Sequence, residues 1–261
     1  FATTDPDETL ARVRGFFIEA EAKYGTVSAI GYGTFGPAAV SVESSDYGKI
    51  RNTPKPGWQG VDVLGFLTKY FPNVRMAFDT DVNAAAIGEG RYGAARGLKD
   101  YIYITVGTGI GGGVVMAGKP LHAQPHAEIG HMLVPLLKGE KKGFQGCCKF
   151  HGRCLEGLAS GSALGQRWGG PACDLAPEHE AWDLEAGYLA AMVQNLMACY
   201  APQRIILGGG VMEQDFLLEE VRSRALTAMA GYWDADDDLL AQPELGNQAG
   251  IIGALVMASS A

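Results

Sequence analysis

Apolar and polar positions follow a helical period at the start of the chain. The apolar residues that fall on one face of this helix are Leu10, Val13, Phe16, Phe17, Ala20 and Tyr24. Asp5 is suited to cap the helix and Pro6 to its first position, and Glu8 follows three residues after the cap, as in a capping box. Gly25 is expected to end the helix.

The rest of the chain alternates between strand-like and helix-like apolar patterns. Strands are expected at 27–33, 74–78, 101–106, 114–116 and 204–207. Helices are expected at 61–70, 82–92, 155–168, 182–200, 214–230 and 249–258. This alternation predicts an α/β fold whose sheets are covered on both faces. Because two strands each run into a glycine turn, we expect two related lobes with a cleft between them and a boundary near residue 98.

The composition is typical of a globular protein and limits its partners. Apolar residues make up 47% of the 261 residues, and the apolar runs are too short to span a membrane. No basic signal-peptide start opens the chain. The net charge of −8, with no basic stripe, argues against nucleic acid as the main partner. We therefore expect a cytoplasmic protein that binds small molecules, and glycine loops can hold phosphate without many lysines.

Three of the five cysteines lie within eight residues of one another, which favours metal binding in a reducing compartment over disulfides. The spacing C-x-x-H-x-x-C brings together Cys148, His151 and Cys154. Zinc would need a fourth ligand, for which His131 and His126 are the upstream candidates. Cys147 could replace Cys148, although only Cys148 gives even spacing. Four protein ligands would make the zinc structural, and the alternative is a chance cluster of buried thiols.

The strand at 101–106 leads into a turn rich in glycine and threonine at 107–113. Backbone N–H groups in such a turn can approach phosphate oxygens, and threonine hydroxyls add donors. The turn matches neither a P-loop nor G-x-G-x-x-G, and a glycine turn in an ordinary hairpin is the alternative. A second turn, at 208–210, also follows a buried strand and favours a nucleotide site.

Three acidic residues are candidates for sugar chemistry. Asp81 lies where a strand meets a helix, and it could accept a proton from a sugar hydroxyl that attacks phosphorus, or simply cap the helix. Glu128 and Glu156 lie in largely apolar or glycine-rich segments and suit bidentate bonds to vicinal hydroxyls, although each could be an ordinary exposed acid.

In order along the chain, these segments resemble the ROK family of sugar kinases and sugar-responsive repressors, over nearly the whole length. The most specific features are E-x-G-H at 128–131 and C-x-x-H-x-x-C-x-E at 148–156. Within the family, the fructokinase branch is matched best, through segments at 34–37, 53–58, 79–85, 205–211 and 249–254.

The resemblance implies a two-lobed, actin-like (RNase H-like) ATPase fold with a zinc-binding loop. It implies a smaller lobe at 1–98, a larger lobe at 99–247, and a closing helix at 248–261 that packs back on the smaller lobe. It implies ATP-dependent phosphorylation of a hexose, most similar to the formation of fructose 6-phosphate, with Asp81 as the general base. A homodimer is common among such relatives.

The resemblance also implies the binding residues. Sugar would be held by Gly36, Asp81, Glu128, His131 and Glu156. The nucleotide, with its Mg²⁺, would be held by Thr105, Gly107, Thr108, Gly109, Gly208, Gly209 and Gly210. Zinc would be held by His131, Cys148, His151 and Cys154.

Two departures from the family pattern stand out. Glucokinases of this family usually have Asn where this chain has Thr80, which favours the fructokinase branch. The family's Asp-x-Gly-Gly-Thr-Lys phosphate turn would lie upstream of Phe1, so the natural protein is expected to be longer at its start. The alternatives are a mannokinase or glucokinase, and a sugar-sensing repressor, which would need an upstream helix-turn-helix.

Overall fold

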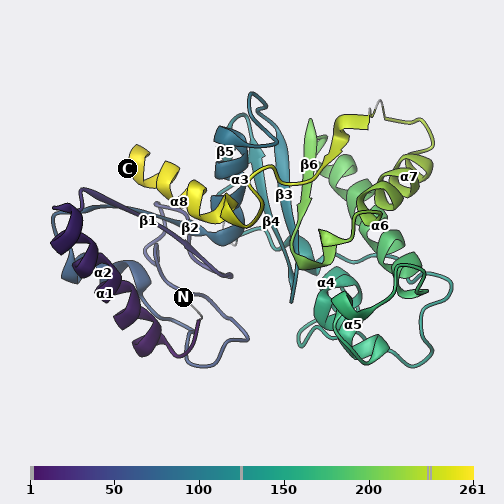
Figure 1. Cartoon of the computed structure of the whole chain (residues 1–261), viewed down its shortest axis with the longest axis horizontal. Coiled ribbons are helices and arrows are strands. Elements are labelled where there is room, and N and C mark those ends of the chain that lie inside the picture. The colour runs from purple at the N-terminus through teal and green to yellow at the C-terminus, as the bar shows by residue number, and fades with distance from the viewer. Residues whose placement is uncertain (1–2, 124–125, 234, 236) are drawn as a thin grey trace.

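Two β-sheets with helices packed on them organise the chain (Figure 1). The computed structural model describes residues 3–123, 126–233, 235 and 237–261. The first sheet pairs two parallel strands, β1 (Ala29–Thr34) and β2 (Arg75–Thr80). The second has the order β5-β4-β3-β6-β7, with bounds β3 (Tyr101–Val106), β4 (Ile110–Met116), β5 (Lys119–Pro120), β6 (Arg204–Gly208) and β7 (Leu240–Ala241). The α/β class expected from the sequence is confirmed.

Eight α-helices occur in the described part of the chain. They are α1 (Pro6–Tyr24), α2 (Val63–Tyr70), α3 (Asp81–Tyr92), α4 (Leu155–Ala159), α5 (Gly161–Trp168), α6 (Ala181–Tyr200), α7 (Leu217–Met229) and α8 (Ala249–Ser260). Short 3-10 turns are η1 (Ile129–His131), η2 (Ala172–Asp174), η3 (Gly210–Glu213), η4 (Asp237–Leu239) and η5 (Gly246–Gln248). None of these helices combines the length and the apolar character needed to cross a membrane.

The start and end of α1 follow the expected signals, with one difference. The Asp5 carboxylate accepts a hydrogen bond from Glu8 N at 3.0 Å, and the chain leaves the helix at Gly25 with φ 91°. The capping box is not completed, because the Glu8 carboxylate instead accepts a hydrogen bond from the Thr4 hydroxyl and pairs with Arg12.

Two further expectations at element level are wrong. The expected helix at 155–168 is two helices, because Ser160 has extended backbone and its hydroxyl caps α5 by accepting from Ala163 N at 3.1 Å. The glycine turn at 107–113 is also shorter than expected, since β4 begins at Ile110 and includes three of the glycines. Gly107 N donates to Gly109 O at 2.9 Å, so the turn itself spans only 107–109.

The strand glycines of β4 have a packing role. A Cβ on Gly113 would collide with the backbone of Val82, so glycine is what lets α3 lie close against the second sheet. Val82 is the second residue of α3 and follows Asp81 directly. This close packing therefore carries the Asp81 end of α3 to the face of the larger sheet.

The last helix packs across the middle of the molecule (Figure 1). A Cβ on Gly253 would collide with the Ala84 carbonyl of α3, and a Cβ on Gly31 of β1 would collide with the Ala254 carbonyl of α8. Glycines thus allow three elements that are far apart in the sequence to meet at backbone distance.

Separate hydrophobic cores support the two sheets. One core, around the first sheet, includes Leu10, Ile30, Trp58, Val63, Leu67 and Phe78. A larger core lies between the second sheet and the helices after residue 155, and it includes Ile102, Ile104, Leu158, Tyr188, Leu189 and Leu207. The Ala-rich inner face of α3 packs in a third cluster with Tyr101, Tyr103, Ile206 and Ala249.

Candidate active site

Asp81 opens onto a cavity at the junction of β2 and α3. Thr80 is buried and its hydroxyl caps α3 by accepting from Asn83 N at 3.2 Å, which leaves Asp81 as the first helical residue. Asp81 Oδ1 accepts from Val82 N at 2.8 Å. Asp81 remains exposed, yet the protein atoms crowded around its carboxyl raise its pKa by desolvation, against the opposing effects of these N–H groups and of Lys55.

The cavity beside Asp81 has a volume of about 440 Å³ and lies between α3, the second sheet and the start of α8. Besides Asp81, it is lined by Thr105 at the end of β3 and by Gly208 and Gly209 at the end of β6. The carboxylate and both strand ends therefore face one common space. Gly209 has φ 94°, and a Cβ there would collide with the backbone of Val106, so the turn requires glycine.

The remaining nucleotide-site candidates are the 107–109 turn after β3 and Gly210, the first residue of η3. Gly107 and Gly210 each have open space where a Cβ would stand, so their backbones can be approached closely. Gly161 N donates to Gly107 O at 2.7 Å, and the Ser162 hydroxyl donates to Thr108 O at 2.6 Å. The first turn of α5 thus holds the 107–109 turn in place.

Two glutamates lie close enough to Asp81 for their charges to interact. Glu156 lies in α4, and its Oε2 accepts from Ile110 N at 3.1 Å. Glu128 directly precedes η1, and desolvation together with the charges of Glu156 and Asp81 raises its pKa to about 7. A Cβ on Gly36 would stand 3.2 Å from Glu128 Oε1, so the turn after β1 faces this carboxylate. The structure therefore brings together all of the sugar-site acids expected from the sequence.

Four metal-ligand side chains converge next to these acids. The ligand atoms of His131, Cys148, His151 and Cys154 all lie within 4.8 Å of one another. His131 Nδ1 is 3.4 Å from Cys154 Sγ and 3.7 Å from Cys148 Sγ, and Cys148 Sγ is 3.8 Å from His151 Nδ1. For tetrahedral zinc, standard bond lengths place nitrogen and sulfur ligands about 3.6 Å apart. The donor set and its spacing therefore fit one zinc ion.

Of the alternatives left open for the metal ligands, the structure places His131 and Cys148 in the converging group. Cys147 Sγ faces Ser160 Oγ at 3.5 Å and lies outside the four-residue group. His126 also lies outside it. His131 reaches the cysteines from η1, because Leu155 N donates to Met132 O at 2.9 Å and ties the end of that turn to the start of α4.

Sequence reasoning assigned no role to three polar residues near the site. Lys55, in the Thr-Pro-Lys-Pro-Gly-Trp segment, stands over the Phe35 ring at 4.6 Å and lowers the pKa of Asp81 through its charge. Asp79 is buried and its Oδ2 lies 2.7 Å from His122 Nε2, which raises the pKa of His122. Lys55 and Asp79 lie within segments already singled out, whereas His122 carried no sequence signal.

Comparison with known proteins agrees with this arrangement. The model of the ROK family matches residues 1–261. A fructokinase of Zymomonas mobilis is 40% identical over 264 aligned residues, covering 99% of this chain and 87% of that protein. A fructokinase of Pediococcus pentosaceus is 39% identical and is covered to 88%. The crystal structure of a ROK hexokinase from Thermus thermophilus has a TM-score of 0.80 and 29% identity, covering 99% of this chain and 88% of that one.

The fold and the cavity-facing strand ends define an α/β protein of the actin-like class. Within that class, the chain belongs to the ROK family, as the match over its whole length shows.

Proposed function

We propose that the protein is an ATP-dependent fructokinase that converts ATP and D-fructose to ADP and D-fructose 6-phosphate. The observation that carries the proposal is the cavity shared by Asp81, Thr105 and the glycines that end β6, with Glu128 and Glu156 close to Asp81. The similarity to fructokinases of 36–40% identity supports fructose as the acceptor.

Asp81 is the proposed general base. Its Oδ would accept the proton of the fructose 6-hydroxyl while that oxygen forms its bond to the γ-phosphorus and the bond to the ADP oxygen breaks. Desolvation raises the pKa of Asp81, which makes this carboxylate a stronger base than an ordinary aspartate, while the hydrogen bond from Val82 N and the charge of Lys55 oppose the shift. The N-terminal position on α3 also favours the anion.

The nucleotide site would rely on backbone groups. The cavity residues include the acids Glu213 and Asp215 and no lysine or arginine. Phosphate oxygens would therefore be held by the N–H groups of the 107–109 and 208–210 turns and by the Thr105 and Thr108 hydroxyls. Mg²⁺ bound with ATP would offset the phosphate charge and stabilise the transition state. The acidic lining and the open glycines fit such a magnesium nucleotide.

The sugar would be held from the larger lobe by Glu128, His131 and Glu156, and from the smaller lobe by Gly36. His131 would use Nδ1 for zinc, since this atom faces both cysteines, and would keep its other ring nitrogen for a sugar hydroxyl. We also propose lobes at 1–98 and 99–247, with α8 joining the first, and a homodimer in solution.

The zinc would be structural because all four positions are filled by protein ligands. We expect about one zinc per chain, with chelation loosening the 146–154 loop. Cys154→Ser should lose the metal, whereas Cys147→Ser should keep it, because the Cys147 thiol points to Ser160. Metal analysis of the two purified variants checks this, and zinc retained in Cys154→Ser at the wild-type level would contradict the ligand set.

A coupled assay that detects ADP, with fructose, mannose and glucose in parallel, tests the proposed function. Fructose should have the highest kcat/KM. Asp81→Asn should lower kcat by about 100-fold or more while leaving the fold and zinc content unchanged. A higher kcat/KM for mannose or glucose would show that fructose is not the preferred phosphoryl acceptor. Near-normal turnover in Asp81→Asn would show that Asp81 is not the general base.

A further inference from the structure

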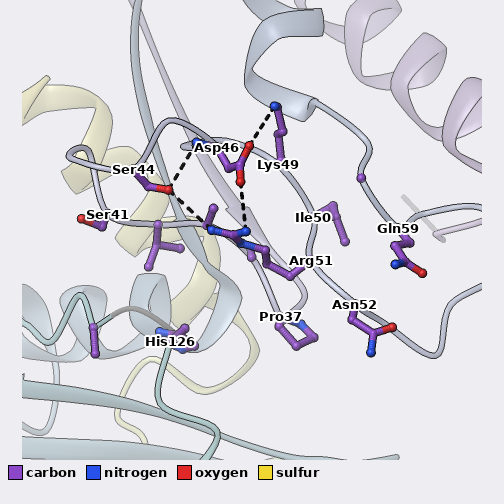
Figure 2. Close-up of a pocket in the computed structure, with 15 residues that line it drawn as sticks. Pro37, Ser41, Ser44, Asp46, Lys49, Ile50, Arg51, Asn52, Gln59 and His126 are labelled. Carbon is purple, nitrogen blue, oxygen red and sulfur yellow. Dashed lines mark hydrogen bonds and ion pairs between the residues drawn. The ribbon is translucent and has the colours of Figure 1, made fainter.

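A second cavity lies beside the proposed sugar site and takes no part in the proposed reaction. Its volume is about 830 Å³, and it is lined by the loop that follows β1 and by Ala123 and His126 (Figure 2). The polar residues that carry the argument are Ser44, Asp46, Arg51, Asn52, Gln59 and His126. A cavity of this volume is within the range that small-molecule sites occupy.

The cavity adjoins the site for the first sugar at two points. Pro37 lines it and directly follows Gly36, which faces Glu128. His126 also lines it, two residues before Glu128. A ligand that occupies both spaces would therefore run from the proposed phosphorylation site into this cavity.

The wall formed by the 38–51 loop is anchored to the sheet. The Tyr47 hydroxyl accepts from Phe78 N at 3.2 Å and donates to Phe78 O at 3.4 Å, which ties the loop to the edge of β2. Ala39 N donates to Lys49 O at 2.9 Å, closing the loop on itself. Hydrogen bonds to β2 and within the loop therefore hold this wall of the cavity in place.

Several polar groups around the cavity lack protein partners. His126 is 9% exposed, and its Nδ1 has no hydrogen-bond partner. Within the described residues, the side-chain amides of Asn52 and Gln59 make no hydrogen bond to the protein. Figure 2 shows both amides on the same side of the cavity, across from His126. The His126 side chain is buried, and buried polar groups are nearly always paired, so its free Nδ1 points to a ligand that can hydrogen-bond to it. The amides of Asn52 and Gln59 are exposed and offer both donors and acceptors to such a ligand.

The charged groups of the cavity are paired with one another. Asp46 pairs with Lys49 at 3.0 Å through Oδ1 and with Arg51 at 3.0 Å through Oδ2. The Arg51 guanidinium also donates to Ser44 Oγ at 3.5 Å. Both cations thus share one carboxylate, and the groups left over are neutral amides and an imidazole. The hydroxyl groups of a sugar, which both donate and accept hydrogen bonds, match these neutral groups.

We propose that this cavity binds a second, uncharged sugar ring joined to the hexose whose primary hydroxyl is phosphorylated, so that fructose-containing disaccharides are substrates. The inference rests on the proposed function for the phosphoryl step, which remains ATP to sugar hydroxyl with Asp81 as proton acceptor. Asn52, Gln59 and His126 would hold the second ring.

The test compares sucrose, turanose and maltulose, in which a glucose ring is attached to different carbons of fructose, with fructose itself. At least one disaccharide should be phosphorylated. The double variant Asn52→Ala/Gln59→Ala should lower the ratio of disaccharide to fructose kcat/KM by about tenfold or more, the effect of two lost hydrogen bonds. The matched control Asn73→Ala/Gln166→Ala, at exposed amides remote from the cavity, should leave the ratio unchanged.

Calorimetric titration of the same disaccharides separates this inference from the proposed function. If fructose is phosphorylated but no disaccharide is phosphorylated or bound, the inference is overturned and the fructokinase proposal remains. If no sugar is phosphorylated, the fructokinase proposal fails, and disaccharide binding that weakens in Asn52→Ala/Gln59→Ala still supports the cavity as a sugar site. Titration could instead show two fructose molecules bound per chain, one of which is lost in that variant. This result would assign the cavity to a separate monosaccharide and overturn the proposal that the second ring is joined to the first.

Discussion

A buried ion pair between Arg167 and Glu140 is the point at which a single change should cost the most stability. Arg167 Nε lies 2.9 Å from Glu140 Oε1, and Nη2 lies 3.1 Å from Oε2, so the contact is bidentate. The Arg167 side chain is 0% exposed and that of Glu140 is 9% exposed. Tyr188 donates to Glu140 Oε2 at 2.7 Å, and Arg167 donates to Leu158 O of α4 at 2.7 Å. The pair therefore links the segment before the 146–154 loop to α4, the helix that carries Glu156.

Glu140→Gln would leave the Arg167 charge buried without an anion. Breaking a buried pair from one side costs about 3–5 kcal/mol, a large share of the 5–15 kcal/mol typical of a folded protein. The nearby Glu185 could reduce this cost. Glu185 is fully buried, neither of its oxygens has a partner, and burial raises its pKa well above the ordinary value. Ionisation of Glu185 would return a negative charge to Arg167, so Glu140→Gln/Glu185→Gln should cost more than the sum of the two single changes.

Differential scanning calorimetry of the purified variants measures this effect. Glu140→Gln should lower Tm by about 10 °C. The matched control is Glu219→Gln, the same substitution at a side chain that pairs with Arg222 but is 70% exposed, which should cost less than about 1 kcal/mol. A Tm for Glu140→Gln within error of the Glu219→Gln value would refute the reasoning that the Arg167–Glu140 pair is buried away from solvent.

Two further predictions concern pH and backbone packing. The hydrogen bond to Asp79 raises the pKa of His122 above 6.5 in the folded protein, so the stabilisation is complete below that pH and is lost as pH rises through the folded pKa. The difference in Tm between the wild type and His122→Gln should therefore be largest in mild acid and shrink toward alkaline pH; a constant difference would contradict this. Gly253→Ala should destabilise by about 1–3 kcal/mol, because its methyl group meets the Ala84 carbonyl, whereas Gly250→Ala in the same helix has open space and should stabilise by up to about 1 kcal/mol. Chemical denaturation distinguishes the two, and equal effects would contradict the packing argument.

Local sequence patterns were sufficient for most elements and for the candidate chemistry. The cap at Asp5, the stop at Gly25 and the strand before Asp81 depend on residues within a few positions of one another, and they lie close to where they were expected. The strands β5 and β7 were not predicted, because two-residue strands carry no periodic signal and form only through pairing with β4 and β6.

The identity of the residues that meet was decided by the tertiary structure. The spacing along the chain supplied three candidate metal ligands and three candidate carboxylates for the sugar site. It could not choose between His131 and His126, or between Cys148 and Cys147, because those choices depend on how η1 docks against α4. The raised pKa of Glu128 likewise arises from carboxylates that are distant in sequence. Spacing along the chain fixes local geometry, whereas desolvation and charge coupling depend on long-range packing that no short pattern encodes.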